Sequence, residues 1–293
     1  MSENAPLFSV LIANYNDGAY IQNAIQSIFQ QTYTNWEIVI VDDCSTDNSE
    51  SILKQYETYD TIRIYHNDIN KGCGFTKKKL VELSKGDYFG FLDADDALDK
   101  NAIEHMVQYH IKEPRAGMIY SNLYICDKDL QIIKEGNTGG EKHFDSNSSD
   151  INKKNITHFV TFKRSFYNKT EGVNPLLKCA EDVDIYYKME EVGSIIYFPE
   201  CLYYYRQGTN NNISLGDNTD NAFYWEFYAT VCACIRRGIS IERNAFPLMT
   251  YYRQVMIAKG ALTTKETFSY RLGHFLLSPF YHLMKILKKP FKH

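Results

Sequence analysis

Three aspartates follow a short apolar run near residue 90, and their type and spacing suit metal chemistry. The run Tyr88–Leu92 is too brief for a helix and leads directly to Asp93, Asp95 and Asp96, a pattern typical of a buried strand that ends at a charged rim. Like charges this close repel one another, so a site that keeps them ionised generally supplies a cation or hydrogen-bond donors. Carboxylate oxygens suit Mg²⁺ and Mn²⁺, and Mg²⁺ typically takes one or two of them beside water and substrate phosphate. The alternative is a solvated acidic turn that precedes a helix.

A further aspartate, Asp43, ends an earlier strand of the same kind. Phe8–Ala13 and Trp36–Val41 are apolar runs of strand length, and between them apolar residues repeat at intervals of three and four, which predicts a helix. Strand, helix and strand form a βαβ unit whose parallel strands end at one edge of the sheet. Open α/β sheets bind ligands at that edge. We therefore expect Asp43 and the later aspartates around one cleft, with Lys77 or Lys78 nearby.

Strands and helices continue to alternate up to about residue 215. The predicted helices are 21–29, 49–59, 75–84, 100–111 and 179–188. The other predicted strands are 62–65, 117–126, 130–134, 156–162, 194–198 and 201–205. This alternation predicts an α/β fold, a Rossmann-like and mostly parallel sheet flanked by helices. Residues 136–155 are rich in Gly, Asn, Ser and Asp, and we expect a loop that is mobile or closes over a ligand.

From about residue 217 the strand signals stop and further helices are expected, one near Trp225–Val231 and another over Phe246–Ala261. We place a domain of residues 1–215 before a helical C-terminal region of residues 216–293. Residues 271–293 contain no acidic side chain, and at about 100° per residue their basic and apolar side chains fall on opposite sides. Such a helix suggests binding to an anionic membrane surface. The alternative is a helix packed on the body of the protein with its lysines in water.

Composition narrows the class of protein. The 293 residues are 44% hydrophobic and 23% charged, as in soluble globular proteins, and the formal charge of −4 argues against nucleic-acid binding. The seven cysteines are dispersed and lack paired spacing, which favours a reduced, cytoplasmic setting. Neither a secretory signal nor a run of about 18 apolar residues is seen. We expect a cytoplasmic protein, peripheral at the inner face of the cell membrane if the C-terminal tail binds lipid.

Five ordered segments resemble the family 2 glycosyltransferases, which have the GT-A fold. The segments are residues 8–16, 41–47, 70–72, 91–96 and 180–182, and the resemblance covers roughly residues 7–210. Members of this family are inverting, metal-dependent enzymes that use nucleotide sugars, and they are common in bacterial surface-polysaccharide assembly. The resemblance implies a GT-A sheet with a helical C-terminal extension.

The resemblance also implies roles for particular residues. The implied roles are recognition of the uracil imide by Asp43, a base pocket lined by Ala13 and Tyr15, contact with the ribose by Asp93, metal ligation by Asp95 and general-base catalysis by Asp182. Physical chemistry is consistent with them, because a carboxylate accepts the N3–H that uracil has and cytosine lacks. Asp182 would take the proton of the acceptor hydroxyl as that oxygen attacks the anomeric carbon. Glu181 is the rival base, and as an alternative both carboxylates simply favour a helix start.

The sequence departs from the family pattern in two places. Many relatives have Arg-Asn where this chain has Lys77 and Lys78, which leaves open which lysine meets the diphosphate. Arg206 and Gln207 occupy the region of the Gln-X-X-Arg-Trp motif, but the Trp is absent, which favours transfer of a single sugar over processive synthesis. His158 is either a histidine of the core or a contact to acceptor or phosphate.

The resulting hypothesis is a Mn²⁺- or Mg²⁺-dependent inverting glycosyltransferase. It would move one hexosyl or N-acetylhexosaminyl unit from a UDP-sugar to a saccharide or polyprenyl-linked acceptor in surface-polysaccharide synthesis. The first alternative is a nucleotidyltransferase that forms sugar nucleotides, although the Gly-rich basic loop usual after its first strand is missing here. The second alternative is a non-catalytic scaffold that binds sugar nucleotides.

Overall fold

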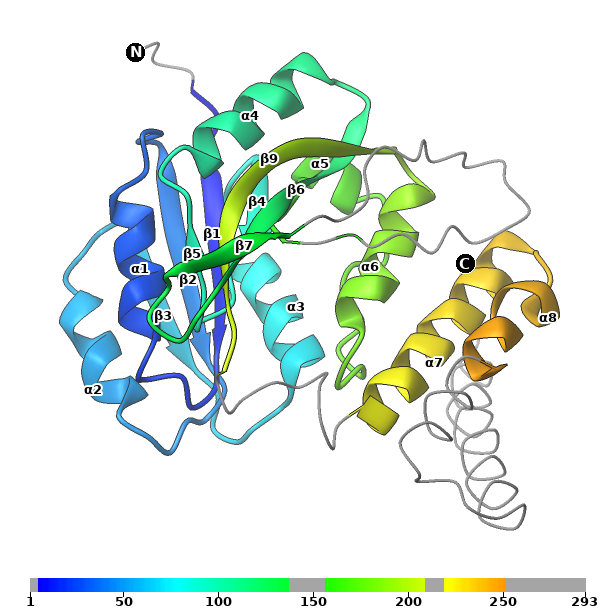
Figure 1. The fold of residues 1–293 in the computed structure, drawn as a ribbon, viewed down its shortest axis with the longest axis horizontal. Helices are drawn as coiled ribbons and strands as arrows, with labels where there is room; N and C mark the ends of the chain where they lie inside the picture. The colour runs from blue at the N-terminus through cyan, green and yellow to red at the C-terminus, as the bar shows by residue number, and fades with distance from the viewer. Residues whose placement is uncertain (1–4, 137–155, 157, 209–218, 251–293) are drawn as a thin grey trace.

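The computed structural model describes residues 5–136, 156, 158–208 and 219–250. The strands are β1 (Phe8–Asn14), β2 (Trp36–Asp42), β3 (Ile62–His66), β4 (Tyr88–Phe91), β5 (Ala97–Leu98), β6 (Ala116–Cys126), β7 (Ile132–Gly136), β8 (Val160–Lys163) and β9 (Ser194–Arg206). The helices are α1 (Ile21–Phe29), α2 (Ser49–Leu53) with the 3₁₀ turn η1 (Lys54–Tyr56), α3 (Cys73–Leu83), α4 (Ala102–Lys112), α5 (Arg164–Tyr167), α6 (Glu181–Glu190), α7 (Thr219–Arg237) and α8 (Ile241–Asn244). Helices lie on both sides of one central sheet (Figure 1).

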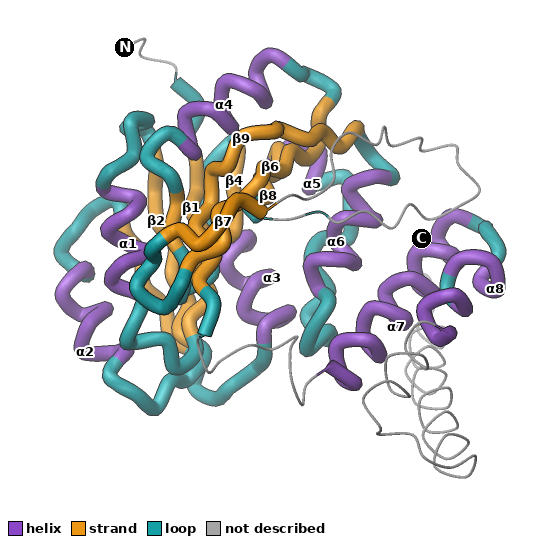
Figure 2. Tube along the Cα trace, in the orientation of Figure 1, coloured by secondary structure: helices purple, strands orange, loops and turns teal. Residues whose placement is uncertain are grey.

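The sheet is parallel on one side and mixed on the other. Its strand order is β3-β2-β1-β4-β8-β6-β9-β5, and β7 pairs with β6. The neighbours from β3 to β4 are parallel, β8 is antiparallel to both β4 and β6, and β6 and β9 are parallel again. The predicted α/β fold and the opening βαβ unit are confirmed. Figure 2 shows the strands gathered between α1 and α2 on one side and α3 and α6 on the other.

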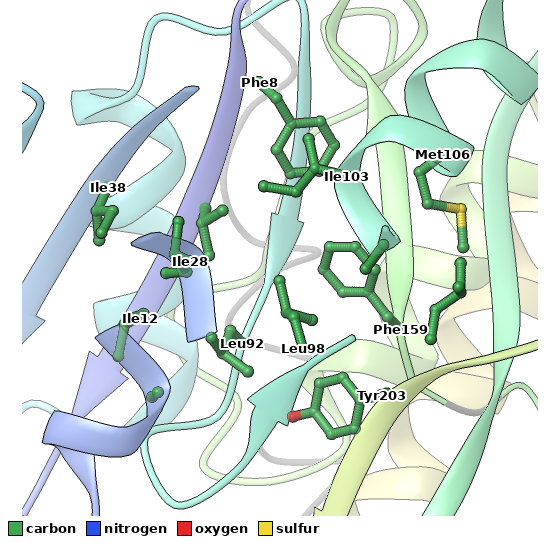
Figure 3. Close-up of a cluster of buried hydrophobic side chains, with 14 of the residues drawn as sticks. Phe8, Ile12, Ile28, Ile38, Leu92, Leu98, Ile103, Met106, Phe159 and Tyr203 are labelled. Atoms are coloured by element: carbon green, nitrogen blue, oxygen red, sulfur yellow. The ribbon is translucent and has the colours of Figure 1, made fainter. Parts of the chain in front are cut away.

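Two apolar clusters hold the helices on the two faces of the sheet. In β1, Val10 and Ile12 join the cluster that includes α1 and α4, whereas Leu11 joins the cluster that includes α3 and α6. This alternation follows from the two-residue period of a strand. Figure 3 shows the first cluster, in which Phe159 and Tyr203 pack with residues of β1, α1 and α4. Because both faces are covered, the central strands are continuous apolar runs.

Several predicted boundaries differ from the structure. The strand expected from residue 156 begins at Val160, and 194–198 and 201–205 form one strand, β9, with register shifts against β6. The short helix α5 was not predicted. α7 confirms a helix around 225–231, and residues 246–250 are helical. Gly136, the first residue of the loop expected over 136–155, ends β7. The rest of that loop, the domain boundary expected near 215 and the basic tail over 271–293 lie outside the described residues. Among the helices that are described, none has the length and apolar character needed to cross a bilayer.

Candidate active site

A hollow lies where β4 ends, between α3 and the first turn of α6. Five polar or charged side chains line it: Lys77, Asp93, His158, Glu181 and Asp182. Its other lining residues are Phe91, Val160, Phe162, Val173, Ile185 and Tyr186. The polar side chains come from segments far apart in the sequence, and they meet at the edge where open α/β sheets bind ligands.

The antiparallel pairing of β8 with β4 brings His158 to this hollow. Gly90 pairs with Thr161. The same register continued beyond the strands sets His158 opposite Asp93, and the imidazole Nε2 lies 3.9 Å from Asp93 Oδ2. The imidazole also stacks on Tyr203, with ring centroids 5.0 Å apart. His158 is therefore held at the rim of the hollow, beside the acidic loop.

Strand β9 supports the acidic loop after β4. The backbone N–H of Asp93 donates to the Tyr203 hydroxyl at 3.2 Å, and Arg206 Nε donates to the Asp95 carbonyl at 2.5 Å. The backbone N–H of Arg206 donates to Asp96 Oδ1 at 2.7 Å. Burial, together with the charges of Asp95 and Asp93, raises the pKa of Asp96 well above its usual value. Asp96 is thus an interior carboxyl whose ionisation is disfavoured, whereas Asp93 and Asp95 are less buried.

The donor chemistry of this loop suits a divalent cation that is bound together with a diphosphate. The Asp93 side chain is 39% exposed and Asp95 is partly buried. Among the residues that the structure describes, no three or more His, Cys, Asp or Glu side chains are grouped to hold a metal by themselves. A Mg²⁺ site typically uses only one or two carboxylates and completes its shell with phosphate and water. The loop offers that number of ligands.

Asp43 is surrounded by hydrogen-bond donors from the loop that follows β3. Its Oδ1 accepts from Asn67 Nδ2 and from the backbone N–H of Lys71, each at 2.8 Å. Its Oδ2 accepts the backbone N–H of Gly72, also at 2.8 Å. The carboxylate is only 4% exposed, so its orientation is set by the loop rather than by solvent.

The two residues predicted to line the base pocket lie next to Asp43. Ala13 and Tyr15 flank Asn14 at the end of β1, and the Asn14 carbonyl accepts the backbone N–H of Asp43 at 2.8 Å. Tyr15 is 45% exposed, which leaves its ring open to a ligand. These residues and Asp95 are not in the lining of the hollow, which contains Asp93, Lys77 and Asp182 from the predicted set.

The two lysines of α3 face different surroundings. Lys77 Nζ donates to Glu181 Oε1 at 2.7 Å, with side chains only 14% and 8% exposed. Lys78 Nζ pairs instead with Glu82 one turn later on the same helix at 3.1 Å, with 36% and 60% exposure. Lys77 is thus the lysine that reaches the hollow.

The carboxylates of Glu181 and Asp182 are in different electrostatic states. Burial opposes ionisation of Glu181, but Lys77 outweighs it and holds the pKa of Glu181 below its usual value. Burial and the neighbouring charge of Glu181 raise the pKa of Asp182. Environments that drive two neighbouring pKa values apart are typical of acid–base sites. Glu181 is committed to an ion pair, whereas Asp182 is the more basic carboxylate.

Sequence reasoning missed how far β9 supports the site. Arg206 was considered only for the motif region that it occupies, and no supporting role was predicted for Tyr203. Asn67, which orients Asp43, follows a strand just as the predicted ligands do, so its position was a usable signal. The contacts of Tyr203 and Arg206 join segments more than 100 residues apart. Local sequence patterns do not predict such contacts.

The sequence matches a family model and several known proteins. The sequence model of "Glycosyl transferase family 2" matches residues 9–170. The chain is 30% identical to chondroitin synthase of Escherichia coli over 74% of this chain and 30% of that protein. It is 28% identical to the putative teichuronic acid biosynthesis glycosyltransferase TuaG of Bacillus subtilis over 73% of this chain and 84% of that protein. The chain thus spans less than a third of the first relative and most of the second.

Solved structures show the same fold at low identity. The S. aureus TarS structure in complex with UDP-GlcNAc has a TM-score of 0.59 at 18% identity, over 76% of this chain and 66% of that one. The mannosyltransferase PcManGT from Pyrobaculum calidifontis, in complex with GDP-Man and Mn²⁺, has a TM-score of 0.59 at 14% identity, over 98% and 89%. These likenesses support the fold, and the family match spans more than half of the sequence. The chain belongs to glycosyl transferase family 2.

Proposed function

We propose that this protein is a metal-dependent inverting glycosyltransferase that moves one sugar from a UDP-sugar to a saccharide or lipid-linked saccharide. The observation that carries the proposal is the hollow that Asp93 and Asp182 line together. Asp93 follows β4, at the edge of the sheet where a donor is expected. Asp182 lies in the first turn of α6, across the hollow. A donor bound at the acidic loop would therefore present its sugar toward Asp182.

Asp182 is the proposed general base. Glu181 is already paired with Lys77 at 2.7 Å, whereas the raised pKa of Asp182 makes it the better proton acceptor of the two. Asp182 would take the proton of the acceptor hydroxyl as that oxygen attacks the anomeric carbon. Attack from the face opposite the leaving diphosphate inverts the configuration at that carbon.

Asp95 is the proposed ligand of Mn²⁺ or Mg²⁺. A divalent cation at such a site neutralises charge on the diphosphate as it leaves. The contribution of the chain is to hold the Asp95 backbone through Arg206. Support comes from PcManGT, whose complex contains Mn²⁺.

Asp43 is proposed to select the nucleotide. Three donors from its own loop orient the carboxylate, and an oxygen with a remaining lone pair can accept uracil N3–H. Ala13 and Tyr15 would form the base pocket, and Asp93 would contact the ribose. TarS supports a UDP-sugar, whereas PcManGT binds GDP-Man, so the choice of UDP rests on Asp43.

The names of two relatives support a cellular role for the proposed enzyme. TuaG is named for teichuronic acid biosynthesis and WcaA of E. coli, which is 30% identical over 64% of this chain, for colanic acid biosynthesis. We propose a role in bacterial surface-polysaccharide synthesis, on the cytoplasmic side of the membrane. Attachment to anionic lipid through residues 271–293 is part of this proposal and rests on the sequence of that tail.

The test is transfer by the purified protein from a panel of UDP-, dTDP- and GDP-sugars, with Mn²⁺, Mg²⁺ or EDTA and with saccharide acceptors. We expect metal-dependent release of UDP that requires an acceptor. Asp182→Asn should abolish transfer and leave the affinity for UDP unchanged. Loss of transfer and of UDP binding together would refute the role of Asp182 as base, and formation of pyrophosphate from UTP and a sugar phosphate would identify a nucleotidyltransferase instead.

A further inference from the structure

Lys77 and Glu181 form a buried ion pair that joins two helices beneath the hollow. Besides accepting from Lys77, Glu181 Oε1 accepts the thiol of Cys73 at 3.2 Å. The ammonium group of Lys77 also lies 5.4 Å from the centre of the Phe91 ring. Both partners are therefore enclosed by protein, with exposures of 14% and 8%. A buried ion pair of this kind is costly to break, because each charge then remains without a partner.

A second contact joins the same two segments. The backbone N–H of Gly74, in the first turn of α3, donates to the carbonyl of Leu177 at 3.1 Å. A Cβ at Gly74 would lie only 2.3 Å from that carbonyl oxygen, so the turn of α3 approaches this segment as closely as a residue without a side chain permits. The segment leads to Ala180, the residue before the first turn of α6, which has a φ of 56°. Helix α3 thus holds the start of α6 through both backbone and side chain.

We propose that Lys77 and Glu181 are a positioning pair that holds the first turn of α6 so that Asp182 meets the acceptor hydroxyl, and that Lys77 is not a ligand of the donor diphosphate. Asp182 directly follows Glu181, so any shift of Glu181 moves the proposed base. This inference rests on the proposed glycosyltransferase function, since it needs an acceptor and a general base.

The charges around Asp182 are consistent with this role. The groups that face it are Glu181 and Tyr186 on α6, Lys77 on α3, His158 before β8 and Asp93 after β4. The negative charge of Glu181 raises the pKa of Asp182, and the positive charge of Lys77 lowers it. Removing one charge or the other should therefore move the pKa of Asp182 in opposite directions, which a purely structural contact would not do.

The test compares Lys77→Met, Glu181→Gln and the double variant with the intact protein. We expect each single variant to lose about 100-fold in kcat, the cost of displacing a catalytic group by about 1 Å, while the Kd for UDP stays within about twofold. The acidic limb of the pH profile of kcat/KM should move to lower pH in Glu181→Gln and to higher pH in Lys77→Met. The losses in the double variant should not add, because the two residues act as one unit.

A matched control is Glu37→Gln, which breaks another ion pair whose carboxylate is buried. Glu37 and Arg63 are 2.6 Å apart, outside the hollow. This variant should lose thermal stability without a shift of the pH profile, which separates positioning from general destabilisation.

Two results would overturn the proposal. A tenfold or greater rise in the Kd for UDP in Lys77→Met would make Lys77 a diphosphate ligand. Equal losses of kcat with no shift of the acidic limb in either single variant would reduce the pair to a structural contact. If the intact protein transfers no sugar from any donor, the proposed function fails and this inference fails with it. If the intact protein transfers sugar but the variants give either of the two results above, this inference alone is refuted.

Discussion

Arg206 offers the sharpest prediction about the acidic loop, because its guanidinium group is bound on every side. Nε donates to the carbonyl of Asp95 at 2.5 Å, Nη1 donates to the carbonyl of Lys128, and Nη2 donates to Asn23 Oδ1 at 3.3 Å. The group also lies 4.6 Å from the centre of the Tyr20 ring. The residue is only 3% exposed. It therefore ties the loop that carries Asp95 to α1 and to the segment before β7.

We expect Arg206→Lys to be strongly destabilising although it keeps the charge. A lysine ammonium lacks the planar fork of the guanidinium and can replace about one of the three hydrogen bonds. Hydrogen bonds that involve a charged group contribute about 1.5–3 kcal/mol each. Two lost bonds, partly replaced by water, should lower the free energy of unfolding by about 3 kcal/mol, or Tm by roughly 5 °C.

The functional effect of Arg206→Lys should be a lower affinity for the metal ion. With its backbone anchor gone, Asp95 is less well placed, and we expect the affinity for Mn²⁺ in the presence of UDP to fall about tenfold, which corresponds to about 1.4 kcal/mol. The free Mn²⁺ signal in electron paramagnetic resonance measures this binding without any turnover. Arg115→Lys, at an exposed position, is the control for the substitution itself. A Tm and a Mn²⁺ affinity equal to those of the unaltered protein would refute the reasoning.

Two other perturbations test other parts of the fold and site. Burial and the nearby charge of Lys163 lower the pKa of His110 to about 3, so between pH 6.5 and pH 3 the unfolded chain binds a proton that the folded protein does not. Stability should fall as the pH drops through that range, and His110→Phe should reduce the loss measured by chemical denaturation at pH 7.5 and pH 5. In Asp43, both carboxylate oxygens accept a backbone N–H, so the amide NH₂ of Asp43→Asn would face a hydrogen-bond donor in either orientation of the side chain. It should raise the Kd for UDP at least tenfold in calorimetry, and an unchanged Kd would remove Asp43 from the nucleotide site.

The parallel half of the fold was predictable because its signals are local. The runs in β1 and β2 are apolar on both faces, and the period between them is helical, so a βαβ unit follows from a few residues at a time. The placement of ligand candidates after strands follows from the same topology. The mixed half was not predictable in this way, because the direction of β8 depends on partners that no local pattern specifies.

The spacing of residues along α3 already indicates which of Lys77 and Lys78 faces the interior of the protein. Leu80 and Val81 are buried on α3, and Lys77 precedes them by three and four residues, so it shares their face of the helix. Lys78 is spaced four residues from Glu82, which predicts the surface ion pair that forms. By contrast, the burial of Asp96 next to the more exposed Asp93 and Asp95 reflects the contact with Arg206, which only the folded chain provides.

The antiparallel direction of β8 brings residues near its start together with residues near the end of β4 in one site. In an all-parallel sheet the start of β8 would lie at the edge opposite the end of β4. Because β8 runs the other way, its beginning meets the end of β4, so His158 and Val160 lie across from Asp93 and Phe91. These four residues all line the hollow. The antiparallel direction of β8 therefore places His158 and Val160 at the edge of the sheet where the donor is expected. Asp182, in the first turn of α6, lies in the same lining.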